Sequence, residues 1–232
     1  MIISVHQPQY LPWLGYFHKI CSSSEFVFLD NVQYKVREYQ NRNRIRTADG
    51  WMWLTVPVLK AEHSYPNISS VRIDNSRDWR KQHWKSLISN YGHAPFFKKY
   101  GGFFEDMYGM DWDKLAEFNI YTVKGIARLL GIDRPIYFES QLNIDTKNTQ
   151  RIIDICKALK ADTYLSGDGG KKYLDEKLFA HNGIRLAYQD FKHPEYKQRY
   201  ALFEPFMSII DLLFNHGSDS LKMLTECRSS SK

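Results

Sequence analysis

Cysteine is scarce in this chain: its 232 residues include only three, at Cys21, Cys156 and Cys227. An odd number without a repeating spacing excludes a disulfide framework, and no Cys or His pair has the spacing of zinc ligands. The chain also lacks the basic start and apolar stretch of a secretory signal, and no apolar run is long enough for a membrane span. We therefore expect a cytoplasmic protein with no membrane span and no metal. No motif requires a cofactor, although a nucleotide or an acyl donor is compatible with the sequence.

Glycine and proline are also few, 13 and 8 respectively, and they form no linker, repeat or low-complexity tract. Hydrophobic residues make up 43% and charged residues 25% of the chain, which excludes disorder and fibrous structure. We predict a single domain over residues 1–232.

Aromatic side chains and positive charge are what the sequence has in excess. Aromatic residues reach 15%, and 32 Lys and Arg against 26 Asp and Glu give a net charge of +6. Rings with polar edges and a moderate basic excess favour an anionic partner, and a phosphate-bearing metabolite fits as well as nucleic acid.

Periodicity predicts an α/β fold. Apolar, β-branched runs indicate strands at residues 2–5, 25–30, 53–59, 163–166 and 184–188. Helical spacing indicates helices from about residue 13 or 14, and at 75–91, 111–130, 146–159, 172–181 and 205–215. Their alternation in the second half predicts a central, partly parallel sheet flanked by helices, Rossmann-like in type. Ligands bind beyond the carboxyl ends of such strands, so the turns after Val5, Asp30 and Ser166 are the expected site.

The turn after the first predicted strand reads HQPQYLPWLGYFHK over residues 6–19. His6 can move a proton near neutral pH, so we predict that it is a general acid or base, with Lys19 as a charge partner. Gly15 permits close backbone approach. The other predicted binding residues of this turn are Gln7, for polar groups, and Tyr10 and Trp13, for stacking on a sugar or base. The alternative is an ordinary strand-to-helix turn whose rings belong to the core.

A second group follows the strand at residues 25–30. We predict that Asp30 orients or assists His6, and that Arg42 and Arg44 hold phosphate or carboxylate. Asn41 and Asn43 alternate with these arginines, so an extended chain would turn one pair inward, and an inward asparagine pair would be a binding feature. Further candidates nearby are Gln33 and Tyr34. A solvated basic loop explains the same residues equally well.

The third group is YLSGDGGKKYLD at residues 164–175. A strand that ends in a glycine-rich turn with lysines after it is suited to cradle an anion through backbone N–H groups. The candidate residues are Ser166, Gly167, Gly170 and Tyr173. The spacing matches neither the P-loop nor the dinucleotide fingerprint, and a plain glycine turn is the alternative.

The segments HQPQYLPWLGYFHK, NRNRI, LTVPV, YLSGDGGKKYLD and SIIDLLFNHG, in this order across nearly the whole chain, resemble the WbqC-like protein family. The resemblance implies a bacterial role in surface-polysaccharide (O-antigen) and amino-sugar biosynthesis. It implies transfer of an acyl or aminoacyl group onto a nucleotide-linked amino sugar. The implied partners are a small anionic metabolite, such as a nucleotide sugar or an acyl or aminoacyl donor, and nucleic acid would enter only as a carrier tRNA.

A fainter similarity, in FVFLDNVQY and YLSGDGGKKYL, is to pantoate-AMP ligase and other nucleotidylyltransferase-like folds. Here Trp13 and Tyr16 occupy the two histidine places around Gly15 in the H-x-G-H motif that holds ATP phosphates in those proteins. The difference argues against adenylyl transfer by that motif and leaves a nucleotide-type pocket. The alternatives are therefore an ATP-dependent adenylate-forming ligase or nucleotidylyltransferase, and a non-enzymatic anion-binding or nucleic-acid-binding module.

Overall fold

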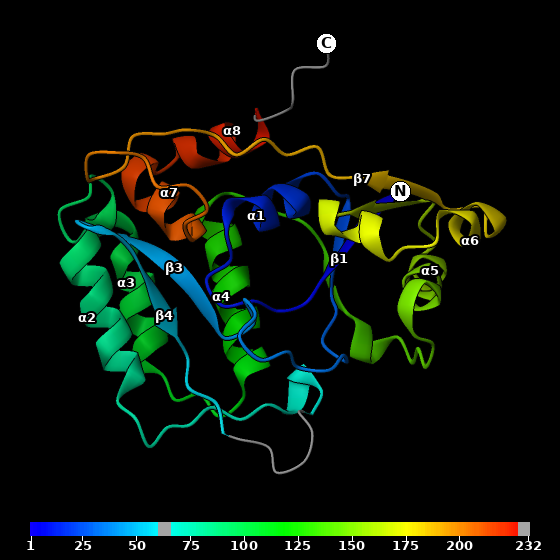
Figure 1. Ribbon diagram of the computed structural model, residues 1–232, viewed down its shortest axis with the longest axis horizontal. Coiled ribbons are helices and arrows are strands. Elements are labelled where there is room, and N and C mark those ends of the chain that lie inside the picture. Colours follow the sequence, from blue (N-terminus) through cyan, green and yellow to red (C-terminus); the bar gives the residue numbers. More distant parts are fainter. Residues whose placement is uncertain (60–65, 227–232) are drawn as a thin grey trace.

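A five-stranded sheet forms the centre of the computed structural model, which describes residues 1–59 and 66–226 (Figure 1). Its strands are β1 (Ile2–His6), β2 (Glu25–Phe28), β5 (Ile136–Phe138), β6 (Thr163–Ser166) and β7 (Arg185–Tyr188). They lie in the order β5-β2-β1-β6-β7, and every pairing is parallel. The predicted α/β fold is confirmed, and the sheet is more regular than the partly parallel one that the sequence indicated.

The strands are apolar on both faces because helices cover both. Phe26 and Phe28 point to the larger hydrophobic cluster, whereas Val27, between them, points to the smaller one, as the period of two along a strand requires. The smaller cluster joins the sheet to α5 (Asn148–Ala158) and α6 (Glu176–His181). In Figure 1 α6 lies beside β7, and α5 lies next to α6.

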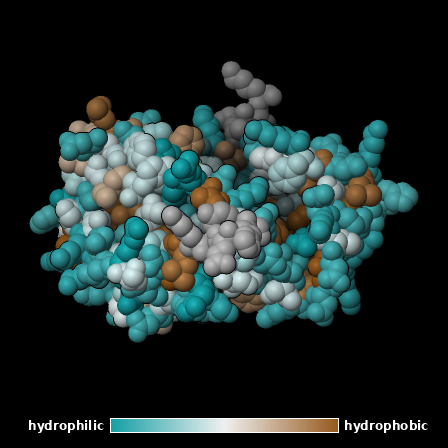
Figure 2. Space-filling view, turned by 60° about the horizontal axis from the view of Figure 1, so that its bottom comes forward, coloured by the Kyte–Doolittle hydropathy of each residue, from teal (hydrophilic) through white to brown (hydrophobic). Residues whose placement is uncertain are grey.

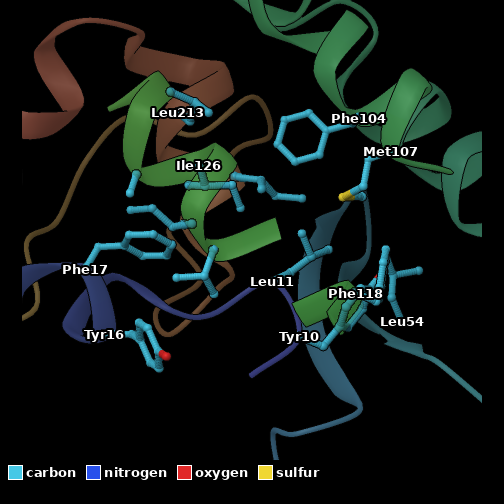
Figure 3. Packing of buried hydrophobic residues seen from close by; sticks show 14 of the residues in the cluster. Tyr10, Leu11, Tyr16, Phe17, Leu54, Phe104, Met107, Phe118, Ile126 and Leu213 are labelled. Carbon is cyan, nitrogen blue, oxygen red and sulfur yellow. The ribbon is translucent and has the colours of Figure 1, made fainter. Parts of the chain in front are cut away.

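The larger cluster joins the sheet to most of the other helices. They are α1 (Leu14–Cys21), α2 (Trp79–Tyr91), α3 (Phe97–Gly109), α4 (Leu115–Leu129), α7 (Ile209–His216) and α8 (Asp219–Thr225). A two-stranded antiparallel sheet, β3 (Arg42–Thr47) and β4 (Gly50–Thr55), packs among them. Figure 3 shows the contact, where Tyr10, Leu11 and Leu54 gather around Phe118 of α4. Three 3₁₀ turns complete the described elements: Ile68–Ser70, Glu139–Gln141 and Asp168–Lys172.

The hairpin is where the sequence prediction was least accurate. A strand was expected at residues 53–59, but β4 ends at Thr55, before Pro57, which has no N–H for a ladder. The segment 42–47, interpreted as a possible basic loop, is strand β3. Residues 97–109, 136–138 and 219–225 carried no prediction and form α3, β5 and α8.

Helices α6 and α7 are among those that begin later than predicted, and side-chain caps explain where these two begin. Asp175 accepts a hydrogen bond from the Leu178 N–H, so α6 begins at Glu176 rather than at residue 172. Ser208 accepts from the Ile210 N–H, so α7 begins at Ile209 rather than at residue 205. Asp and Ser are preferred at these positions because their oxygens satisfy N–H groups that the first turn leaves unpaired.

Cys21 and Cys156 are free thiols. Burial raises the pKa of Cys21 to about 11 and that of Cys156 to about 12, so neither is a thiolate near neutral pH. Cys227 lies outside the described residues. Among residues 1–59 and 66–226, no helix is both long enough and apolar enough to cross a bilayer.

Candidate active site

The strand order reverses at β1, which defines one crevice in the sheet. The chain builds outward from β1 to β2 and β5, and then returns to place β6 and β7 on the other side of β1. In open parallel sheets the ligand crevice lies at this reversal, outside the carboxyl ends of the strands. His6 ends β1, and Ser166 ends β6 beside it. The turns after Val5 and Ser166 therefore meet, as the sequence predicted.

Lys19 extends from α1 beneath this crevice. Its side chain is only 3% exposed, and its Nζ donates a hydrogen bond to the Val5 carbonyl at 3.0 Å. A Cβ on Gly167 would lie 4.0 Å from the same Nζ, so the turn after β6 passes close to the ammonium. Within the described part of the chain Lys19 forms no salt bridge. Burial lowers the pKa of Lys19 to about 7.

His6 is a neutral imidazole next to this lysine. Its Nδ1 lies 3.2 Å from the Gln7 carbonyl. A carbonyl can only accept, so Nδ1 carries the hydrogen and Nε2 has the free lone pair. Burial, and then the charge of Lys19, lower the pKa of His6 well below its ordinary value, against the opposing effect of the Gln7 bond. Near neutral pH Nε2 of His6 is therefore unprotonated, which leaves its lone pair available as a general base.

Tyr16 and two glutamines position this turn. The Tyr16 ring lies 4.6 Å from the His6 ring, and its hydroxyl donates to the Gln7 carbonyl at 3.0 Å. The Gln7 side-chain oxygen accepts from Gln40 Nε2 at 2.5 Å. Gln189 Nε2 donates to the Gly15 carbonyl at 2.8 Å, which ties the end of β7 to the start of α1. These contacts fix the backbone on which His6 and Lys19 are mounted.

Sequence reasoning missed both Gln40 and Gln189. Gln189 directly follows β7, so the rule that ligand sites lie beyond the carboxyl ends of strands could have found it. No comparable signal marks Gln40, because it lies in an irregular segment before β3.

The glycine turn after β6 packs closely on its own strand. A Cβ on Gly170 would lie 2.1 Å from Ser166 Oγ, so only glycine fits there without displacing the serine. Ser166 Oγ donates to the Gly167 carbonyl at 3.0 Å, and the Gly170 N–H is used within the 3₁₀ turn. Tyr173, at the end of this turn, is 71% exposed.

Asp30 lies on the β5 side of the sheet edge. Its carboxylate accepts from the Ser140 N–H at 2.9 Å and from Ser140 Oγ at 2.7 Å. Within residues 1–59 and 66–226 it has no hydrogen bond to His6, whose orientation comes from the Gln7 carbonyl instead. The reason is that β2 lies between β1 and β5, and the chain after β2 turns toward β5. The assistance to His6 that we expected from Asp30 is not part of this geometry.

Glu139, beside Asp30, is fully buried. Burial raises its pKa, and Arg151 Nε lies 3.8 Å from its carboxylate.

Four further candidates are placed away from the crevice. Tyr10 is fully buried, and its hydroxyl lies 2.8 Å from His83 Nδ1 and 2.5 Å from the Tyr108 hydroxyl. Trp13 packs on Phe191, and its ring covers the place where a Gly15 Cβ would be. The remaining two are Gln33, exposed in an isolated bridge to Asn67, and Tyr34, buried in the larger cluster. The core interpretation therefore describes Tyr10 and Trp13 better than stacking on a ligand does.

Asn41 and Asn43 do face inward, as one alternation of the sequence allowed. Their Nδ2 groups donate to the Val56 carbonyl at 2.9 Å and to the Leu11 carbonyl at 2.7 Å. These amides join the hairpin to neighbouring backbone. Arg42 and Arg44 lie on the opposite face of β3, over tryptophan rings.

Two hollows of the surface lie away from this crevice. One of about 600 Å³ lies along α3 and α4, and one of about 660 Å³ is lined by residues 195–203. No group of three or more His, Cys, Asp or Glu in the described ranges is arranged to hold a metal ion. The crevice beside β1 is thus defined by chemistry and topology rather than by volume.

The strand order and the helices on both faces of the sheet define a doubly wound α/β protein, with His6 and Lys19 near its topological switch point. The chain belongs to the WbqC-like protein family, whose profile matches residues 7–223. It is 34% identical over 228 residues to the uncharacterized protein Rv1507c of Mycobacterium tuberculosis (strain ATCC 25618 / H37Rv), covering 97% of this chain and 98% of that protein. No solved structure matches the chain.

Proposed function

We propose that this protein is a transferase of surface-polysaccharide and amino-sugar biosynthesis that moves an acyl or aminoacyl group onto a nucleotide-linked amino sugar. The observation that carries the proposal is the pair at the crevice: a neutral His6 with a free lone pair on Nε2, beside a buried Lys19 that has no acidic partner in the described residues. Amide formation needs a base for the amine and a cation for the anionic parts of the substrates. Family membership supports the biosynthetic setting.

The reaction assigns one task to each group. The sugar amine attacks the carbonyl carbon of the acyl donor, forming a C–N bond and a tetrahedral oxyanion. His6 Nε2 removes a proton from the attacking nitrogen, the bond to the leaving group breaks, and the imidazolium returns the proton to that group. Lys19, protonated, attracts the phosphate of the nucleotide sugar, and the anion in turn raises the lysine pKa.

A nucleotidylyltransferase-like fold is the more specific form of this proposal. The reversal of strand order at β1, which is where open parallel sheets bind nucleotides, supports it. The same feature favours the second candidate, an ATP-dependent adenylate-forming ligase or nucleotidylyltransferase, although Trp13 and Tyr16 replace the histidines of the phosphate-binding motif. The third candidate is a non-enzymatic anion-binding or nucleic-acid-binding module. A cytoplasmic location is part of the proposal, because three cysteines without a repeating spacing do not suggest a disulfide framework.

Ligand-induced stabilisation tests the substrate class. We expect a nucleoside diphosphate amino sugar at about 100 times its Kd to raise the Tm by roughly 5–10 °C, because a ligand that binds only the native state stabilises it. The Lys19→Met variant should lose most of this shift. A thermal-shift panel with nucleotide sugars, ATP, coenzyme A and free amino acids measures it. Stabilisation by ATP alone would favour the ligase, and no shift with any of these ligands would contradict the proposal.

The two basic groups also predict a pH profile. Since kcat/KM reports ionisations of the free enzyme, it should rise as His6 loses its proton below pH 6.5 and fall near pH 7 as Lys19 becomes neutral. In kcat the falling limb should move to higher pH, because bound phosphate stabilises the ammonium. Lys19→Arg keeps the charge and should remove the falling limb. A limb that stays near pH 7 in this variant would show that Lys19 does not cause it.

A further inference from the structure

The β3–β4 hairpin turns one face to the core and the other outward. Asn43 and Ile45 of β3 are buried, while Arg42 and Arg44 point to the opposite side. The antiparallel register places Arg44 directly across from Trp53, so these two side chains share the outer face. The hairpin extends away from β1 in Figure 1, beside α4.

Arginine and aromatic side chains stack on this outer face. The Arg42 guanidinium lies 4.5 Å from the ring centre of Trp53, and that of Arg44 lies 5.0 Å from Trp51. The two tryptophan rings are 5.7 Å apart and nearly perpendicular, and the Tyr39 ring lies 6.1 Å from Trp53. We call these five residues the arginine–tryptophan track.

The track carries positive charge without a carboxylate partner. Neither Arg42 nor Arg44 forms a salt bridge in the ranges 1–59 and 66–226. Arg42 donates to the Arg37 carbonyl, Arg44 donates to the Phe206 carbonyl at 3.4 Å, and the Nε of both arginines is covered and unpaired. The remaining guanidinium donors are available to an anion.

Two of the three rings of the track are open to solvent, and the third, Trp53, is half-buried. Trp51 is 42% exposed and Tyr39 is 41% exposed. The face drawn in Figure 2 is mainly hydrophilic with separate hydrophobic patches. Large aromatic rings exposed beside unpaired cations indicate a binding surface rather than ordinary surface composition.

We propose that the arginine–tryptophan track binds single-stranded nucleic acid. Bases stack on the exposed rings, and the guanidiniums bind phosphates, which is how sequence-tolerant single-strand binding works. Arg42 and Arg44 are two residues apart on one strand, about 6.6 Å, which is close to the separation of successive phosphates in an extended single strand. A duplex keeps its bases stacked inside and offers the tryptophans nothing to stack on. A membrane surface would favour a continuous apolar patch, whereas here cations and rings alternate.

The track begins close to the crevice. Strand β3 starts two residues after Gln40, whose amide contacts the side chain of Gln7. A strand bound along the hairpin would therefore have one end on the side where Gln40 contacts Gln7, the residue after His6. This part rests on the proposed function: a carrier RNA charged with the acyl or aminoacyl group would present it there.

Binding of labelled oligonucleotides by fluorescence anisotropy tests the track itself. The probes are oligo(U) and oligo(dT) of about 12 nucleotides, a hairpin duplex of the same length, and vesicles of phosphatidylserine and phosphatidylcholine. We expect the wild-type chain to bind both single strands more tightly than the duplex, with affinity that falls steeply as salt rises. Quenching of tryptophan fluorescence should accompany binding.

Variants of the track separate stacking from charge. Trp51→Leu and Trp53→Leu should each weaken binding by about 5- to 150-fold, the loss expected for one stacked base. Arg42→Gln with Arg44→Gln should reduce the slope of log affinity against log salt by about 1.4. Lys81→Gln with Lys85→Gln, on the exposed side of α2, is the matched control, because it removes the same charge elsewhere.

Four outcomes would overturn the proposal. They are no oligonucleotide binding at low salt, equal binding of the duplex, binding of vesicles instead of oligonucleotides, and an equal loss in the control pair and the arginine pair. A melting curve of each variant shows whether it is folded. If a variant is unfolded, the wild-type affinities for single strands, duplex and vesicles still test the proposal. Because the probes carry no acyl group, their binding is independent of transfer. If the wild-type protein bound the oligonucleotides but catalysed no acyl transfer, that result would contradict only the proposed function.

Discussion

Replacing His6 with alanine is expected to slow acyl transfer by a factor of about 10²–10⁴ while leaving the Tm nearly unchanged. The loss arises because no other group is shown to accept the proton of the attacking amine. Stability should change little because the imidazole's one described hydrogen bond is to the carbonyl of the next residue. Burying the neutral imidazole, whose Nε2 has no described hydrogen bond, also adds little to the free energy of unfolding. Steady-state kinetics with a nucleoside diphosphate amino sugar, together with a melting curve, measure both quantities.

His93→Ala is the matched control, since His93 is an exposed histidine that follows α2. We expect it to retain wild-type kcat and KM. If His6→Ala instead lowered the Tm strongly and kept its remaining folded fraction active, His6 would be a structural residue and the proposed mechanism would be wrong.

Replacing Arg46 with methionine is expected to lower the free energy of unfolding by about 3–5 kcal/mol. Arg46 is 2% exposed, although it belongs to the same basic segment as Arg42 and Arg44. Its guanidinium donates to four carbonyls, those of Thr47, Gly50, Ala201 and Leu202, and to the side chain of Gln198. Methionine has a similar size but no donor, so these buried acceptors would lose their partners.

Urea denaturation at fixed pH measures this change. Arg44→Met is the control, because the one hydrogen bond described for its guanidinium, to Phe206, is long, at 3.4 Å, and its loss should cost below about 1 kcal/mol. Equal destabilisation by the two variants would show that Arg46 acts through charge or strand propensity rather than through its carbonyl contacts.

The three arginines show what the sequence can and cannot predict here. Alternation along the chain predicted that one pair, either the asparagines or Arg42 and Arg44, would face inward, and the structure shows that it is the asparagine pair. It could not show that residues 198–204 pack over Arg46 and leave Arg42 and Arg44 open, since that depends on a segment about 150 residues away. The asparagine amides bind backbone, and nothing in their spacing distinguishes that from binding a ligand.

The position of the crevice was easier to predict than the side chains that line it. Strand-turn patterns located the turns after Val5 and Ser166, and the geometry of parallel sheets brought them together. Asp30 was placed on the correct edge but next to the wrong strand, because sequence order does not reveal that β2 lies between β1 and β5. Tyr10 and Trp13 looked like ligand-stacking rings, but the aromatic excess supplies much of the core that aliphatic residues would otherwise fill.

The central position of β1 has a consequence for how the chain is made. On emerging from the ribosome, β1 can pair with β2 at once, but its other edge must wait for β6, where Ile2 meets Thr163. Until then the apolar strand IISVH exposes unpaired N–H and C=O groups, which are a template for association with other chains. Truncated products that end before β6 should therefore aggregate. Expression yield should depend on chaperones that shield this one strand edge during synthesis.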